Sequence, residues 1–403
     1  MCLGDGLPSI GSVSLSRLAL GAIAALLSQA AAATQSLPSI VHPAAIDIAS
    51  SPFSPFGDIV STVPGGAGQR VVIAGGAQED FFGWSVAIDG DTALVGAYGT
   101  TVDGHEQQGA AYVFTKADGV WNLSATLTAS DGTAFDIFGE RVALSGNVAA
   151  IGAYQADDAK GAVYVFTGSG SHWTQKARLV ADDGAANDCL GWSLAVTGQH
   201  VLAGAPFVVT GNAETGAIYS FAPSGGTWAQ TQKLVPDDSN SGDEFGSTVA
   251  ADGTTAVVAA DGALVGANYG QGAAYVYSLS RDTWTQQAKL IADDGVTDDN
   301  FGRSVAVSGS TVLVGAPYVT IDGNGFEGAV YVFGGSDWQQ QQKLVASDGA
   351  ADGFFGWSVA VSGSDAIVGE PFANVDANYA QGAAFFYELA APADDTIFAN
   401  GFE

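Results

Sequence analysis

Basic side chains are scarce in this chain. Its 403 residues include 12 Lys and Arg against 42 Asp and Glu, which gives a formal net charge of −30 at pH 7. A surface of that sign repels phosphate backbones and anionic lipid headgroups, so we expect no nucleic-acid partner. The charge favours solubility in an exposed setting, or the attraction of cations and basic partners.

Catalytic and metal-binding motifs are also missing. The chain has two cysteines and four histidines, and it contains neither a CxxC nor an HExxH motif, so a zinc site is not expected. The stretch "GWSVA" resembles a nucleophile elbow only superficially, because Ala stands where that motif needs Gly. We therefore predict no catalytic residue, no certain cofactor and a protein that is not an enzyme.

Long apolar runs are absent except near the N-terminus. There, "LALGAIAALL" follows Arg17 and is itself followed by small residues. The run is too short to span a bilayer comfortably, and the pattern is typical of a signal peptide. We predict a signal peptide over residues 1–33, a linker over 34–68 and no membrane span in the mature chain.

Glycine, by contrast, is abundant, with 55 residues. It occurs between apolar runs without a collagen period, which indicates many tight turns. A Phe-Gly pair, once Leu-Gly, recurs at intervals of 52 to 56 residues, a period typical of propeller blades. The pairs begin at Phe82, Phe138, Leu190, Phe245, Phe301 and Phe355.

Each repeat contains four short segments that read as strands. In the fifth repeat "SVAVSG" is followed by "TVLVGAP", "GAVYVF" and "WQQQQKLVA". Val, Tyr, Phe and Thr favour strands, and Ser-Gly between the first two segments favours a tight hairpin. We name these strands A to D in chain order.

The last repeat lacks strand D, and a matching segment stands at the other end of the repeats. Arg70–Gly83 aligns without a gap with Lys343–Gly356. We predict that Arg70–Ala74 pairs with the last repeat and closes the ring, which hides two sheet edges. The predicted fold is an all-β propeller of six four-stranded antiparallel blades over residues 69–389. The alternative is a seventh, degenerate blade formed by residues 34–68.

The repeat resembles a known family. Phe301-Gly302 followed by Gly315-Ala316-Pro317 is similar to the FG-GAP repeat, which builds the propeller of integrin α chains and recurs in bacterial secreted proteins. The resemblance covers about residues 70–387 and implies a fold rather than one activity. Integrin-type propellers have seven blades and carry calcium loops between strands A and B. The corresponding turns here, such as "SGSTV", are too short to wrap a cation, so that site is not carried over.

Carboxylates gather in the connections from strand D to the next strand A. These D–A loops emerge on the same face of a blade as the B–C loops, so we expect one acidic face. One interpretation is that Asp and Gly simply form turns and cap backbone N–H groups. The other is calcium binding, because calcium takes six to eight oxygen ligands. The candidate ligands are Asp182, Asp183, Asp188, Asp293, Asp294 and Asp298.

Together these features predict a secreted, periplasmic or surface-exposed bacterial propeller that acts by binding or adhesion. We expect a monomer whose partner is an unidentified protein or glycan. The alternatives are a structural component of an envelope or matrix, and an enzyme with a site at the propeller mouth. The end of the 390–403 tail, "DDTIFANGFE", resembles the terminal motif of exported proteins in some gammaproteobacteria and predicts an export or sorting role. The alternative for the tail is a frayed terminus.

Overall fold

The computed structural model describes residues 69–374 and 379–389. The expected signal peptide, the 34–68 segment with its alternative seventh blade, and the 390–403 tail lie outside the described residues. Within the described part of the chain, no helix has the length and apolar character needed to cross a membrane.

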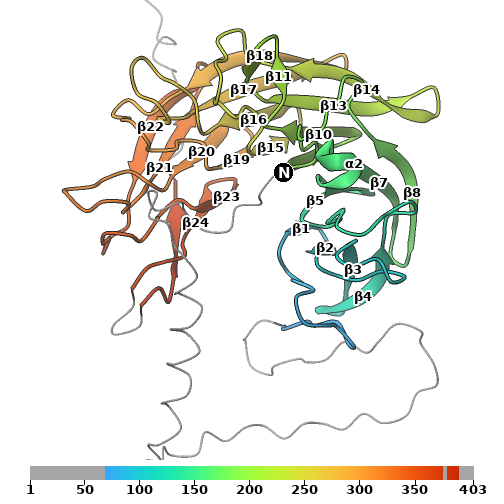
Figure 1. Ribbon diagram of the computed structural model, residues 1–403. Coiled ribbons are helices and arrows are strands. Elements are labelled where there is room, and N and C mark those ends of the chain that lie inside the picture. Colours follow the sequence, from blue (N-terminus) through green and yellow to red (C-terminus); the bar gives the residue numbers. More distant parts are fainter. Residues whose placement is uncertain (1–68, 375–378, 390–403) are drawn as a thin grey trace, which may run out of the picture. The chain divides into compact units, whose positions relative to one another are not determined.

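Six antiparallel sheets follow one another along the chain and form a six-bladed propeller (Figure 1). Blade 1 consists of β1 (Val86–Asp89), β2 (Thr92–Ala97), β3 (Ala110–Ala117) and β4 (Val120–Leu127). Blade 2 consists of β5 (Arg141–Ser145), β6 (Val148–Ala153), β7 (Ala162–Ser169) and β8 (His172–Leu179). Blade 3 consists of β9 (Ser193–Thr197), β10 (His200–Ala205), β13 (Ala217–Ser224) and β14 (Thr227–Leu234).

The remaining blades repeat this order. Blade 4 consists of β15 (Val249–Asp252), β16 (Thr255–Ala260), β17 (Ala273–Ser280) and β18 (Thr283–Leu290). Blade 5 consists of β19 (Ser304–Ser308), β20 (Thr311–Ala316), β21 (Ala329–Gly334) and β22 (Gln339–Leu344). Blade 6 has β23 (Ser358–Ser362), β24 (Asp365–Glu370) and β25 (Ala383–Glu388). A small hairpin, β11 (Val209–Thr210) with β12 (Ala213–Glu214), and one helical turn, α2 (Ala156–Ala159), lie in B–C loops.

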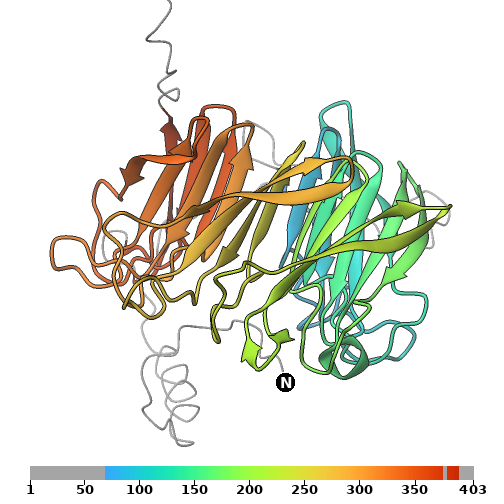
Figure 2. The ribbon, with the colours of Figure 1, turned by 90° about the horizontal axis from the view of Figure 1, so that it is seen from above.

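Turn chemistry fixes the register within each blade. In blade 2, Ser145 pairs with Val148, which leaves a two-residue turn. Gly146 in that turn has φ of 55°, a value that glycine adopts without steric cost. Figure 2 shows the strands of successive blades running side by side, with loops at both of their ends. The predicted four-strand repeat is therefore confirmed for blades 1 to 5.

The core lies between successive blades. Strand A of each blade contacts strand A of the next, from β1 through β5, β9, β15 and β19 to β23. The phenylalanines of the Phe-Gly pairs fill these interfaces, and Phe138, Phe245, Phe301 and Phe355 are each 0% exposed. Glycine on strand B lets the next blade approach closely. A Cβ on Gly96 of blade 1, for example, would lie 1.9 Å from the carbonyl oxygen of Gly139, which leads into blade 2.

The predicted pairing of Arg70–Ala74 with the last blade is wrong for the described residues. Blade 6 is a three-stranded sheet, and residues 70–74 belong to no strand. The segment instead lies against blade 1, where Val71 and Ile73 pack on the cluster that contains Tyr112. These contacts join neighbours in the sequence, whereas a ladder with β25 would join opposite ends of the chain and carry a larger entropic cost of loop closure.

One contact nevertheless shows why the alignment placed a strand D here. The Gln69 side chain donates to the Trp121 carbonyl (2.6 Å) and accepts from the Trp121 N–H (2.7 Å). Gln232 on β14, a true strand D, makes the same pair of bonds to Trp284 on the next blade (3.0 and 2.6 Å). The segment thus stands in the relation to blade 1 that a preceding strand D would have.

Candidate ligand-binding site

The D–A and B–C loops meet on one face of the blades, as the sequence predicted. The main chain of the D–A loops donates hydrogen bonds to carbonyl groups of the B–C loops. Examples are Phe135 N to Glu106 O (2.8 Å) and Asp352 N to Gly325 O (2.9 Å). These bonds fix the two sets of loops against each other and form a continuous loop face.

Several aspartates on this face have structural partners. In blade 3, the Asp183 carboxylate accepts hydrogen bonds from Lys233 (2.6 Å) and from the Tyr219 hydroxyl (2.8 Å). Burial opposes the charged form, but these two donors outweigh it and lower the pKa of Asp183. The same arrangement recurs in blades 4 and 5 as Asp238 with Lys289 and Tyr275, and as Asp294 with Lys343 and Tyr331.

A second set of aspartates closes the D–A loops. The Asp188 carboxylate accepts the Ala185 N–H at 2.7 Å, and Asp136 and Asp299 bond in the same way to Thr133 and Val296. Asp188 is 6% exposed, and this burial raises its pKa. Asp188 therefore acts as a turn-forming residue, in line with the first of the two interpretations.

The six candidate calcium ligands do not come together as one site. Asp183 and Asp294 bind lysine, Asp188 caps its own loop, and Asp182, Asp293 and Asp298 are exposed. Among the described residues, no group of three or more His, Cys, Asp or Glu side chains is arranged to hold a metal ion. Calcium binding stays a prediction.

A hollow of about 610 Å³ interrupts the loop face over blade 2. Its walls come from two D–A loops and from α2, the B–C loop of blade 2. The residues that line it include Thr133, Phe135, Gln155, Asp157, Asp158 and Asn187. The hollow exists because this B–C loop is short: eight residues separate β6 from β7, whereas twelve separate β2 from β3.

Phe135 is the unusual side chain of the hollow. It occupies a loop position where every blade has a positive φ, and its own φ is 68°. The equivalent residues are Glu79, Asn187, Gly242, Asp298 and Asp352. Asn, Asp and Gly tolerate this conformation, whereas a bulky aromatic residue is strained in it. Phe135 is nevertheless 53% exposed, so the strain does not serve packing in the core.

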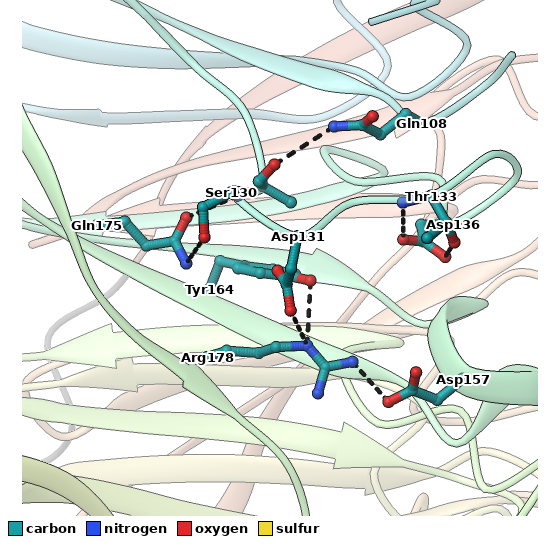
Figure 3. Close-up of polar contacts among 10 residues, drawn as sticks. Gln108, Ser130, Asp131, Thr133, Asp136, Asp157, Tyr164, Gln175 and Arg178 are labelled. Atoms are coloured by element: carbon teal, nitrogen blue, oxygen red, sulfur yellow. Dashed lines mark hydrogen bonds and ion pairs between the residues drawn. The ribbon is translucent and has the colours of Figure 1, made fainter. Parts of the chain in front are cut away.

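An ion-pair network joins the D–A loop that carries Phe135 to α2. Figure 3 shows Arg178 between two loops, with Asp131 on one side and Asp157 on the other. Its guanidinium lies 3.2 Å from the Asp131 carboxylate and 2.6 Å from that of Asp157, and it also donates to Tyr164. Asp157, Asp158 and Ala159 all have positive φ, so α2 is a left-handed turn. Arg178 thereby fixes a second strained segment at the same hollow.

Comparison with known protein families accounts for the repeats. The model of the FG-GAP repeat matches residues 69–114, 121–166, 173–221, 228–277, 284–333 and 338–387. The chain belongs to the FG-GAP repeat family. A comparison with curated proteins returns no match. Family membership establishes a propeller, a fold often used for ligand binding, and leaves the specific function of this FG-GAP propeller to be argued from its own residues.

Sequence reasoning missed Phe135 and Arg178. The signal for Phe135 was present, because an alignment of the six D–A loops shows an aromatic residue at this position only in this loop. The signal for Arg178 was ambiguous, because the equivalent residues Lys233, Lys289 and Lys343 are also basic. Only the short loop of blade 2 brings a second carboxylate, Asp157, to this basic residue.

The calcium prediction can be tested by thermal unfolding. If calcium binds the folded FG-GAP propeller, millimolar calcium should raise Tm above its value in chelator at matched ionic strength. A ligand that binds only the folded state stabilises it by about 2.7 kcal/mol at a hundredfold excess over Kd. Magnesium should do less, because it demands stricter octahedral geometry. The double replacement Asp293→Asn and Asp298→Asn should reduce the shift.

Both replaced residues are exposed, so the variant keeps the Asp294–Lys343 ion pair as an internal control. Equal Tm shifts from calcium, magnesium and sodium chloride would show that the effect is general charge screening. The aspartates would then act only as turn-forming residues.

Proposed function

We propose that this FG-GAP propeller is an exported, non-enzymatic binding protein that holds its ligand in the hollow over blade 2. The proposal of export rests on the N-terminal pattern and on the terminal "IFANGFE" motif. The proposal of binding without catalysis rests on the hollow itself. It combines one exposed aromatic ring with carboxylate and amide side chains and contains no histidine, cysteine or lysine among its lining residues.

The observation that carries the proposal is the exposed, strained Phe135. Backbone strain persists only where the surrounding structure enforces it, and it gathers at binding and catalytic sites. Here the main-chain bond from Phe135 N to Glu106 O, which four other D–A loops reproduce, enforces the conformation. The chain bears the strain at a position where five other loops have a tolerant or polar residue, and this places an aromatic face toward solvent.

The ligand class that best fits this lining is a glycan. An exposed aromatic face offers apolar contact area to the carbon side of a sugar ring. Carboxylate and amide oxygens at Asp158 and Asn187 can accept hydrogen bonds from sugar hydroxyl groups. Binding at such a surface serves adhesion to a glycan-coated cell or matrix, without a reaction.

Glycan arrays followed by calorimetric titration test this function. We expect binding to a subset of glycans, and we expect Phe135→Ala to weaken it by about tenfold or more, or ~1.4 kcal/mol. Phe326→Ala is the matched control, because Phe326 is likewise exposed (45%) with a positive φ (55°), but it stacks on Phe354 in the loops of blade 5, away from the hollow. Equal affinities of the wild type and Phe135→Ala would show that the hollow is not part of the binding site.

A further inference from the structure

The hollow over blade 2 has an unbalanced charge. Asp136, Asp157 and Asp158 line it, and Asp131 lies in the same D–A loop as Phe135. No Lys, Arg or His is among the described residues that line it. The charged side chains that a ligand would meet in this hollow are therefore all carboxylates.

The partners of three of these carboxylates leave the balance negative. Asp131 and Asp157 lie 3.2 and 2.6 Å from Arg178, so one guanidinium is shared between two carboxylates. Asp136 accepts hydrogen bonds from the N–H and the hydroxyl of Thr133 (2.7 and 2.9 Å), as Figure 3 shows. The Thr133 groups are neutral donors, which satisfy the Asp136 oxygens without cancelling their charge.

Asp158 is the carboxylate that faces a ligand without a partner. Its main-chain carbonyl accepts the Asn187 N–H (3.3 Å), which ties residue 158 to the D–A loop of the next blade. Its side chain is exposed and forms no hydrogen bond or ion pair within the part of the chain that the structure describes. The fold thus fixes the backbone of Asp158 at the hollow and leaves its charge available.

The basic residues nearest to this site do not restore neutrality. Arg178 already contacts two carboxylates, and Lys160 is exposed after α2 but does not line the hollow. The whole chain adds a net charge of −30. A negatively charged ligand group would therefore be repelled from the hollow, and a positively charged one would be attracted to it.

We propose that the hollow selects amino sugars, that is, glycans whose rings carry a protonated amine. This inference rests on the proposed glycan-binding function and names the class of glycan. The Asp158 carboxylate accepts charge-assisted hydrogen bonds from the ammonium group. The exposed ring of Phe135 offers apolar contact area, and its face also attracts a cation. N-acetylated sugars lack the positive charge, and uronic or sulfated sugars carry the opposite one.

Calorimetric titration of the full chain with two matched oligosaccharides tests the inference. Glucosamine oligomers should bind at least about fivefold tighter than N-acetylglucosamine oligomers of the same length, and added salt should reduce this preference by screening. Asp158→Asn removes the charge and keeps a residue type that tolerates the φ of 59°. It should weaken binding of the glucosamine oligomer by about fivefold, or ~1 kcal/mol, and leave that of the acetylated oligomer unchanged.

Asp352→Asn is the matched control, because Asp352 is also exposed with a positive φ (65°) but lies outside the lining of the hollow. It should change neither affinity. Equal binding of the two oligomers, or an unchanged preference in Asp158→Asn, would overturn the amino-sugar inference and leave the glycan function standing. Trilysine that binds as tightly as the glucosamine oligomer would overturn it too, since charge alone would then be recognised. Binding of no glycan at all would overturn both proposals.

Discussion

Replacement of Phe301 by Ala should lower the free energy of unfolding by about 3–5 kcal/mol, the range for truncating a fully buried Phe. Phe301 is 0% exposed in the interface between blades 4 and 5. Its ring lies 5.5 Å from that of Tyr331 and 5.8 Å from that of Phe333. The variant therefore loses buried apolar area together with two aromatic contacts. Denaturant titration, with the slope compared between variant and wild type, measures the loss.

Tyr269→Ala is the matched control for this measurement. Tyr269 is 72% exposed on the B–C loop of blade 4, so its truncation removes an aromatic ring without opening a cavity. Its effect should stay within about 0.5 kcal/mol, as for ordinary surface substitutions. Similar midpoints for Phe301→Ala and the wild type would mean that the Phe-Gly pair does not hold the blades together.

The stability of the propeller should also fall as pH rises toward neutrality, because of Glu370. This residue is 3% exposed and replaces the small alanine of the Gly-Ala-Pro motif. Burial, followed by the negative charges of Asp348 and Glu327, raises the pKa of Glu370 to about 7. The folded state thus holds the proton more tightly than the unfolded state, whose pKa is near 4.5. Stability is therefore highest below about pH 4.5 with respect to this group, and it declines up to about pH 7.

Glu370→Ala restores the residue type of the other repeats and should remove this dependence. Between pH 5 and 8, the wild type should lose about 1–3 kcal/mol more stability than the variant, given 1.36 kcal/mol for each pKa unit. Thermal or denaturant unfolding at several pH values measures the difference. Glu214→Ala, at an exposed glutamate of blade 3, should leave the pH profile unchanged. Parallel profiles for the wild type and Glu370→Ala would show that Glu370 ionises normally.

The sequence by itself determined the repeat, the strands and the number of blades. These features depend on local signals: alternation of Val and Ala along a strand, Ser-Gly at a hairpin, and a period of 52 to 56 residues. Because each blade is one supersecondary unit, its sequence contains most of the information for its own sheet. The same reasoning placed the D–A and B–C loops on one face.

Only the tertiary structure decided which side chains of that face bind each other. Asp183 and Lys233 are 50 residues apart and come from different repeats, yet their side chains lie 2.6 Å apart. Sequence spacing therefore suggested a cluster of free carboxylates where the fold makes ion pairs. The hollow beside Phe135 likewise depends on a short loop of one blade and on D–A loops on both sides of it.

At the ends of the repeat array, too, the sequence determined one part of the structure and the tertiary arrangement decided the rest. Sequence alignment related Arg70–Ala74 to a strand D, and in the structure Gln69, just before this segment, makes the contacts of a strand D glutamine, although residues 70–74 form no strand. It could not decide whether that segment pairs with β25, since pairing between chain ends depends on how all six blades are placed. The exposure of Val86 and Phe386 is a property of that placement, not of either residue type.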